Sequence, residues 1–85
     1  MKEFNYIIKD ELGIHARPAG MLTKLAKTYE SEILITKGEK TIAATKLLML
    51  MGLGVKQGEE VTVRIEGADE EAAYEGVLKF FEENL

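Results

Sequence analysis

The sequence predicts an α+β fold in which three helices cover one face of a four-stranded antiparallel sheet. Two observations lead to this fold class. Four short segments bounded by turn residues have the pattern of strands, and three others are predicted as helices, in the order β-α-β-β-α-β-α. Helices in this order can cover only one side of the sheet, so its other face stays open. The 85 residues are expected to form a single domain over 1–85.

The first strand and the first helix are separated by a glycine-containing break. Phe4, Tyr6 and Ile8 alternate with polar residues, which is typical of a strand with one buried face. The segment DELG ends this pattern, and helical spacing begins at Pro18, a residue suited to a first helical turn. The residues expected on the buried helix face are Met21, Leu22, Leu25, Ala26 and Tyr29. Those expected on the opposite face are Gly20, Thr23, Lys24 and Lys27.

A hairpin and a short apolar helix are predicted in the middle of the chain. Residues 32–37 (EILITK) alternate Ile33 and Ile35 with other residues, and a turn at 37–39 leads into the strand KTIAA. The run KLLMLM at 46–51 is too short for an independent helix, which needs about 12–15 residues in water. Tertiary packing must therefore hold it. Its core-facing residues are expected to be Leu47, Leu50 and Met51, with Leu48 and Met49 partly outside.

The last strand and the last helix complete the order. Residues 61–66 (VTVRIE) alternate, with Val61, Val63 and Ile65 on one face. Asp69 is a suitable N-cap for the following helix, and the two glutamates after it suit the positive end of a helix dipole. The buried side of this helix is expected to hold Ala73, Val77 and Phe80 or Phe81.

Composition and charge exclude several classes of protein. The net charge of −4 argues against nucleic-acid binding, which requires basic residues that neutralise phosphates. A local basic cluster of Arg17, Lys24, Lys27 and Lys46 is still compatible with this negative net charge. Without cysteine there is no disulfide, thiol catalysis or zinc–thiolate site. No apolar run approaches the roughly 20 residues of a membrane span, and no export signal is visible. We therefore expect a cytoplasmic protein without membrane insertion, metal or cofactor.

The segment GIHARPAG at 13–20 holds the only histidine, the only proline and one of two arginines. A lone loop histidine is most often without a special role, but three neighbouring features change this interpretation. His15 lies just before a helix start marked by Ala16 and Pro18, where free N–H groups and the dipole favour a phosphate. Arg17 is always charged and can bind two oxygens of a phosphoryl group. Gly13 allows a tight turn that lets the ring point outward.

The chain lacks the groups that would make or hydrolyse a phosphoryl bond. With one histidine and no acid pair inside the motif, neither a catalytic base nor a metal site is visible. The glycines do not have the spacing of a nucleotide-binding P-loop. The sequence therefore predicts a carrier that holds a phosphoryl group on nitrogen, a covalently modified protein substrate without turnover of its own.

The motif Gly13-Ile14-His15-Ala16-Arg17-Pro18-Ala19 resembles the active-site motif of the histidine-containing phosphocarrier family, HPr, of the bacterial sugar phosphotransferase system. The resemblance continues through GLGV at 52–55, Gly58 and GADE at 67–70. It implies an open-faced β-sandwich. It also implies that Nδ1 of His15 takes a phosphoryl group from phosphorylated enzyme I and passes it to enzyme IIA domains, with Arg17 stabilising the transferred charge.

The resemblance also implies a docking surface and one departure from the family. Partners of the family dock on the motif helix and the short helix, which here contribute Gly20, Lys24, Lys27, Leu47, Leu48, Met49 and Met51. Simple core packing is the competing interpretation of the four apolar residues. Some members carry a regulatory serine before the short helix, where this sequence has Lys46. We therefore expect no serine phosphorylation at that position.

Three alternative functions remain beside a sugar phosphocarrier. The first is a carrier for another branch, such as nitrogen-related signalling or dihydroxyacetone phosphorylation. The second is an adaptor that binds transcriptional or metabolic regulators without phosphotransfer. The third, a small RNA- or ligand-binding α+β domain, is disfavoured by the acidic charge and by the absence of paired aromatic residues on a central strand.

Overall fold

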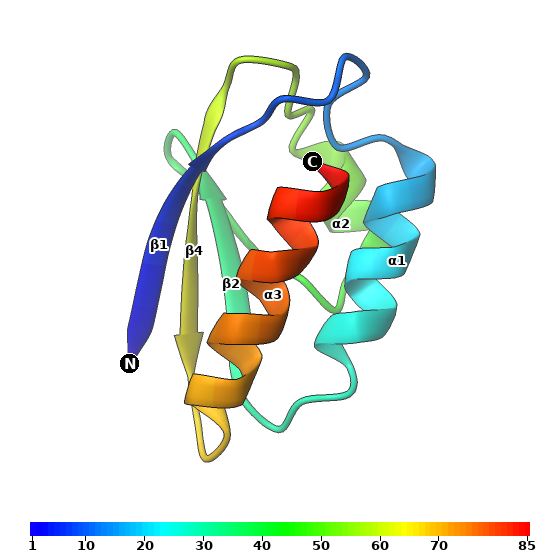
Figure 1. The fold of residues 1–85 in the computed structure, drawn as a ribbon. Coiled ribbons are helices and arrows are strands. Elements are labelled where there is room, and N and C mark those ends of the chain that lie inside the picture. Colours follow the sequence, from blue (N-terminus) through cyan, green and yellow to red (C-terminus); the bar gives the residue numbers. More distant parts are fainter.

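The computed structural model describes residues 1–85 and has the predicted order of elements. The strands are β1 (Lys2–Ile7), β2 (Glu32–Lys37), β3 (Lys40–Ala43) and β4 (Glu60–Glu66). The helices are α1 (Ala16–Ala26), α2 (Leu47–Gly52) and α3 (Glu70–Asn84). The strands form one sheet in the order β1-β4-β2-β3, with every neighbouring pair antiparallel. The three helices lie on one side of this sheet, as Figure 1 shows, so the predicted α+β fold is confirmed.

The core lies between the sheet and the helices. β4 is central and buries every second residue, Val61, Val63 and Ile65, against the helices. From α3, Ala73 and Val77 are buried as predicted, and both Phe80 and Phe81 are buried where one of the two was expected. The ring of Phe81 makes edge-to-face contacts with Phe4 and Tyr6 of β1. Such aromatic pairs contribute about 0.5–1.5 kcal/mol beyond the area they bury. No helix is long and apolar enough to cross a membrane.

The buried face of α1 differs from the prediction by a rotation of the helix. Met21 is 45% exposed and Leu25 only partly buried, whereas Thr23 is buried. The hydroxyl of Thr23 donates a 2.9 Å hydrogen bond to the carbonyl oxygen of Ala44, the segment that precedes α2. This bond satisfies the hydroxyl inside the core, so a polar residue occupies a position that its polarity alone assigned to solvent. The helix also starts at Ala16, before the predicted Pro18, which stays in the first turn.

Only one residue anchors α2 to the core. Leu50 is fully buried, while Leu47 and Met51 are 37% and 40% exposed, so the prediction that these two face the core is wrong. Leu47, Leu50 and Met51 lie toward one side of this six-residue helix, but only Leu50 is covered by the rest of the protein. Leu48 and Met49 lie outside, as predicted. α2 therefore displays four large apolar side chains on the surface.

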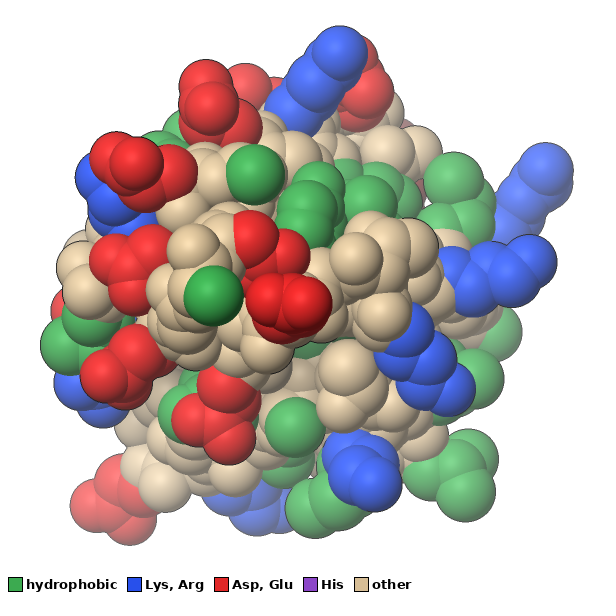
Figure 2. Space-filling view, turned by 90° about the horizontal axis from the view of Figure 1, so that it is seen from below, with side chains coloured by type: hydrophobic (Ala, Val, Ile, Leu, Met, Phe, Trp, Pro, Cys, Tyr) green, Lys and Arg blue, Asp and Glu red, His purple; other side chains and the backbone are tan.

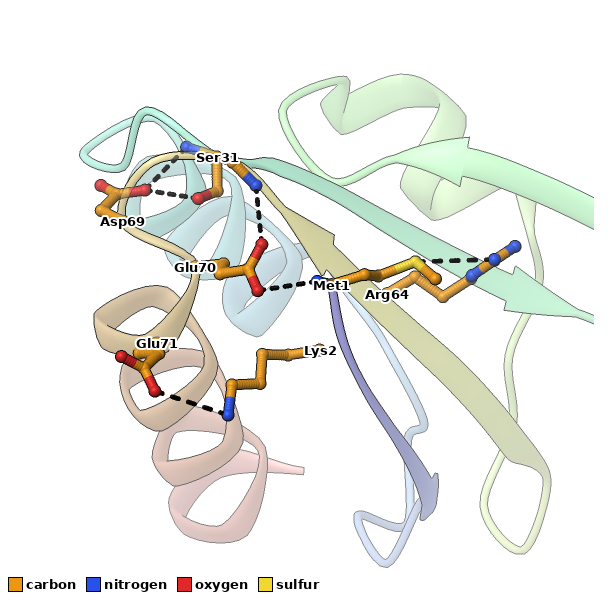
Figure 3. Close-up of polar contacts among 8 residues, drawn as sticks. Met1, Lys2, Ser31, Arg64, Asp69, Glu70 and Glu71 are labelled. Carbon is orange, nitrogen blue, oxygen red and sulfur yellow. Dashed lines mark hydrogen bonds and ion pairs between the residues drawn. The ribbon is translucent and has the colours of Figure 1, made fainter.

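The connection between β4 and α3 is fixed to the connection between α1 and β2. Asp69 is the residue before α3, but its carboxylate does not cap that helix. It accepts hydrogen bonds from the hydroxyl and the backbone N–H of Ser31 (Figure 3). It also accepts one from the backbone N–H of Glu30. These hydrogen bonds lower the pKa of Asp69, the Ser31 hydroxyl most strongly. The predicted N-cap thus joins two loops that are far apart in sequence.

Candidate functional site

His15 is held at the start of α1 by a loop that contacts two distant parts of the chain, around Val55 and at Leu85. Gly13 has φ +68°, and its backbone lies so close to Val55 that an added Cβ would be 2.2 Å from the Val55 carbonyl oxygen. The Ile14 N–H donates to this same oxygen at 3.1 Å, and the Ile14 side chain is buried. On the other side, the N–H groups of Lys9 and Asp10 donate to the main-chain oxygen of Leu85. These contacts fix the backbone on the N-terminal side of His15.

The first turn of α1 leaves hydrogen-bond donors beside the His15 ring. His15 is the N-cap residue with extended backbone (φ −92°, ψ 180°), and no side chain caps the helix. The first intrahelical acceptor is the His15 carbonyl, which binds the Ala19 N–H at 2.9 Å. The N–H groups of Ala16 and Arg17 donate to no protein acceptor, and Pro18 has none to donate. Two free amides at the positive end of an 11-residue helix form a seat for an anion.

The His15 ring, whose side chain is 33% exposed, opens into a surface hollow of about 310 Å³. This hollow is lined by Asp10, His15, Arg17, Pro18, Met21 and Asn84. The structure therefore brings three residues of the predicted motif together. Asp10, Met21 and Asn84 were not predicted as parts of this site. For Asp10 a signal was present, because Asp and Gly three residues apart in DELG are typical of a type I turn.

A larger hollow of about 710 Å³ lies at the opposite end of the molecule, at the start of α3. Its charged groups pair with one another. The Met1 ammonium group binds the Glu70 carboxylate at 2.7 Å, and Lys2 lies 3.7 Å from Glu71 (Figure 3). The Met1 ammonium and the Gly67 N–H lower the pKa of Glu70 by hydrogen bonding. This hollow contains no histidine and no arginine, so it offers neither a nucleophile nor a clamp for a phosphoryl group.

The docking residues predicted from the motif helix and the short helix lie mainly on the surface. Lys24, Lys27, Leu47, Leu48, Met49 and Met51 are exposed, and Gly20 is half-buried. α1 and α2 contact each other, so their exposed residues belong to adjoining surfaces. An added Cβ at Gly20 would meet no atom within 4 Å, so nothing inside the protein requires glycine there.

The two segments that carry these residues are free of acidic side chains. Residues 12–29 contain Arg17, Lys24 and Lys27 but no Asp or Glu, and residues 40–58 contain Lys40, Lys46 and Lys56 but no Asp or Glu. All 15 acidic residues therefore lie elsewhere in the chain. Figure 2, a view of the end away from His15, shows the same separation of acidic from basic side chains. The edge on which α1 lies carries Lys and Arg and almost no Asp or Glu.

Lys46 is the N-cap residue of α2, with extended backbone and no side-chain hydrogen bond to the helix. A lysine has no acceptor atom, so it cannot cap a helix N-terminus as serine or aspartate does. Its carbonyl still accepts the Leu50 N–H at 2.9 Å. At the position where some members of the family that the sequence resembles carry a regulatory serine, this protein therefore has an exposed positive charge at the start of α2.

Comparison with known proteins identifies the family. The family described as PTS HPr component phosphorylation site matches residues 2–83. The chain belongs to the HPr family. HPr of Mycoplasma genitalium is 36% identical over 85 residues, covering 99% of this chain and 97% of that protein. HPr of Lysinibacillus sphaericus is 39% identical over 83 residues, covering 98% and 94%.

Solved structures of HPr proteins have the same fold. A mycoplasma histidine-containing phosphocarrier protein has a TM-score of 0.93 and 32% identity, covering 96% of this chain and 93% of that one. HPr-C-His of Thermoanaerobacter tengcongensis has a TM-score of 0.91 and 38% identity, covering 96% and 92%. Membership of the family gives the chain its activity, that of an HPr phosphocarrier of the phosphotransferase system with a phosphohistidine site. Enzyme I and enzyme IIA are the general classes of partner of such proteins.

Proposed function

We propose that His15 is the phosphoryl acceptor of this phosphocarrier and that Arg17 clamps the transferred group. The observation that carries this proposal is the hollow at the start of α1, where the only histidine of the chain faces the same space as Arg17. The two free N–H groups of the first helical turn add donors for the phosphoryl oxygens. A phosphohistidine protein with one histidine has no other candidate acceptor.

The transfer needs only a nucleophile and stabilisation of charge. The electron pair on Nδ1 of His15 forms the new N–P bond, and the bond from phosphorus to the donor breaks with its electron pair leaving on the donor. The guanidinium of Arg17 can bind two phosphoryl oxygens while the bonds exchange. No group in the hollow is arranged to activate water beside the phosphorus, since the only carboxylate there, Asp10, lies next to Nε2 of His15.

The proposed donor is phosphorylated enzyme I, and the proposed acceptors are enzyme IIA domains. The proposed docking surface consists of Gly20, Lys24, Lys27, Leu47, Leu48, Met49 and Met51. Its support is the exposure of large apolar side chains on α2 beside α1, which together with its C-cap residue Lys27 has three positive charges and no negative one. Such a surface fits a partner with an apolar patch bordered by acidic residues, and the flexible methionines suit several different partners. The cytoplasm is the compartment typical of the family, and we expect it here.

A labelling experiment tests the acceptor. Incubation with enzyme I and radiolabelled phosphoenolpyruvate is expected to give one acid-labile, base-stable phosphoryl group per chain. The label is expected to vanish in His15→Ala. Label that persists in this variant would refute the assignment of His15, and absence of label in the unchanged protein with a competent enzyme I would refute phosphotransfer and favour a regulatory adaptor.

The two arginines provide a matched test of the clamp. Arg17→Ala is expected to slow transfer roughly tenfold to a hundredfold, because charge-assisted hydrogen bonds contribute about 1.5–3 kcal/mol. Arg64→Ala removes the same charge from the outer face of β4, and its rate is expected to match that of the unchanged protein. Equal rates for the two variants would contradict the clamp.

The docking surface is tested with two exposed apolar residues. Leu48→Ala is expected to raise the KM of transfer from enzyme I without changing stability, because Leu48 is 84% exposed. Ile7→Ala, at an exposed residue of β1, is the control and is expected to leave the KM unchanged. A common KM for both variants would show that enzyme I docks elsewhere.

Serine regulation is tested directly. An HPr kinase with ATP is expected to leave the protein unlabelled, because Lys46 offers no hydroxyl at the position where family members carry the regulatory serine, and the only serine, Ser31, is buried. Stoichiometric labelling would show that another hydroxyl, such as that of Thr45, replaces it.

The pathway served by the carrier follows from its partners. A carrier for nitrogen-related signalling or for dihydroxyacetone phosphorylation would use the same His15 chemistry. Transfer assays from the labelled protein to purified enzyme IIA domains distinguish these alternatives, and we expect the sugar branch to accept the label.

A further inference from the structure

Asp10 is the only acidic residue in the hollow that contains the His15 ring. Its Oδ1 lies 3.7 Å from Nε2 of His15, the ring nitrogen that is not proposed to bind phosphorus. Both side chains are about two-thirds buried, with exposures of 30% and 33%. The contact joins residues of the loop between β1 and α1 and involves no other element.

The position of the Asp10 carboxylate is fixed by the backbone around it. The Leu12 N–H donates to the same Oδ1 at 2.8 Å, and the Gly13 N–H donates to the Asp10 carbonyl at 2.9 Å. The Asp10 N–H donates to the Leu85 main-chain oxygen at 2.9 Å. The carboxylate is thus held in a tight turn and cannot leave the ring without breaking that turn.

We propose that Asp10 is a positioning residue that keeps the proton of the His15 ring on Nε2. This inference rests on the proposed role of His15 as the phosphoryl acceptor. A carboxylate has only acceptor atoms, so it favours the tautomer in which Nε2 carries hydrogen and Nδ1 carries the free electron pair. The 3.7 Å distance is longer than a hydrogen bond. A small rotation of the ring shortens it, as is common when a catalytic hydrogen bond tightens on binding the reactant.

Asp10 also balances the charge that develops during transfer. When Nδ1 forms the N–P bond, the electron pair of the broken bond stays on the donor and the proton stays on Nε2. The ring of His15 then carries positive charge, and the carboxylate of Asp10 faces the edge where that charge lies. The phosphoryl oxygens lie at the other ring nitrogen, beside Arg17. Opposite charges thus meet on both edges of the ring, and no proton needs to leave during the step.

The test uses the single histidine as a spectroscopic probe. Long-range ¹⁵N NMR of the unphosphorylated protein reports the ratio of the two ring tautomers, and the rate of transfer from enzyme I charged with phosphoenolpyruvate is measured in parallel. Asp10→Asn removes the charge but keeps an oxygen that can accept the Leu12 N–H. Asp10→Glu keeps the charge. Glu11→Gln is the matched control, because it removes a neighbouring charge that is exposed and contacts no group of the site.

A pair of unit charges about 4 Å apart in water corresponds to roughly a fivefold change in an equilibrium constant. We therefore expect Asp10→Asn to lower both the fraction of the Nε2–H tautomer and the transfer rate, the rate by about fivefold. Asp10→Glu is expected to restore at least half of the rate, and Glu11→Gln to change neither quantity.

Three results would overturn the proposal: an unchanged tautomer ratio in Asp10→Asn, an unchanged transfer rate in that variant, or an equal effect of Glu11→Gln. The tautomer ratio is independent of phosphorylation. A failure of the acceptor assignment, detected by label that persists in His15→Ala, is therefore distinguishable from a failure of the role of Asp10.

Discussion

Replacing Gly13 by alanine is expected to lower the free energy of unfolding by about 2–5 kcal/mol. The backbone at Gly13 has φ +68°, a left-handed conformation that costs an L-residue with a side chain about 1–2 kcal/mol. The new Cβ would also lie 2.2 Å from the Val55 carbonyl oxygen, so one of the two backbones must move. That movement breaks the hydrogen bond from Ile14 to Val55 and leaves a buried donor unpaired, which costs about 1–3 kcal/mol more.

Gly38 provides the control for this prediction. Its φ is +60°, but no atom lies within 4 Å of an added Cβ, so Gly38→Ala is expected to lose only the backbone part, about 1–2 kcal/mol. Urea unfolding by linear extrapolation measures both values, and the melting temperature should fall about 4–8 °C per kcal/mol in a domain of this size. Equal losses in Gly13→Ala and Gly38→Ala would refute the argument that the close approach to Val55 fixes the loop before His15.

Other substitutions test the packing of the helices and the loop contacts. Thr23→Val is expected to destabilise the protein by about 1–3 kcal/mol in thermal unfolding, because a buried carbonyl loses its donor, whereas Thr23→Ser should keep most of the stability. Leu50→Ala should lower the free energy of unfolding in urea by about 2–5 kcal/mol, and Leu48→Ala should hardly change it. Similar decreases for the two variants would show that Leu50 does not anchor α2. The pKa of Asp69 is lowered by the Ser31 hydroxyl. The ionised carboxylate therefore stabilises the fold fully above the ordinary pKa of 3.8, and this stabilisation is lost as the pH falls through the lower pKa of the folded state. Asp69→Asn should therefore make the free energy of unfolding fall less steeply with decreasing pH in the acid range. An equal acid dependence in the variant and the unchanged protein would contradict this.

The sequence was sufficient for the order of elements because its periodic signals are local. Val61, Val63 and Ile65 alternate along β4 and need no knowledge of their partners to be recognised as one buried face. The motif at the start of α1 is equally local, since His15 and Arg17 are two residues apart and the helix begins at Ala16 between them. Pattern and motif therefore predicted the fold, and the motif alone was enough to select His15 and Arg17, which line one hollow in the structure.

The wrong predictions concern contacts between segments distant in sequence. Helical spacing predicts Thr23 on the exposed face of the helix, and the Ala44 carbonyl that accepts its hydroxyl comes near only in the folded chain. Helical spacing predicts Leu47 and Met51 on the side of Leu50, but the rest of the protein covers only Leu50 and leaves these two more than a third exposed. Asn84 lines the hollow only because α3 ends beside the start of α1 (Figure 1). Local sequence patterns thus predict which side chains tend to be buried, but the contacts between distant segments determine which of them are buried.

The bonds that hold the loop before His15 also make its geometry depend on contacts that form late in folding. The loop is tied to Val55, Glu59 and Leu85, and β1 pairs in the sheet with β4, so its contacts reach forward through the whole sequence. Such long-range contacts form only after the loop closures that connect them. A chain still emerging from the ribosome presents GIHARPAG without its surroundings. The surroundings of His15 therefore assemble only when β4, α3 and the segment around Val55 have reached their places in the fold.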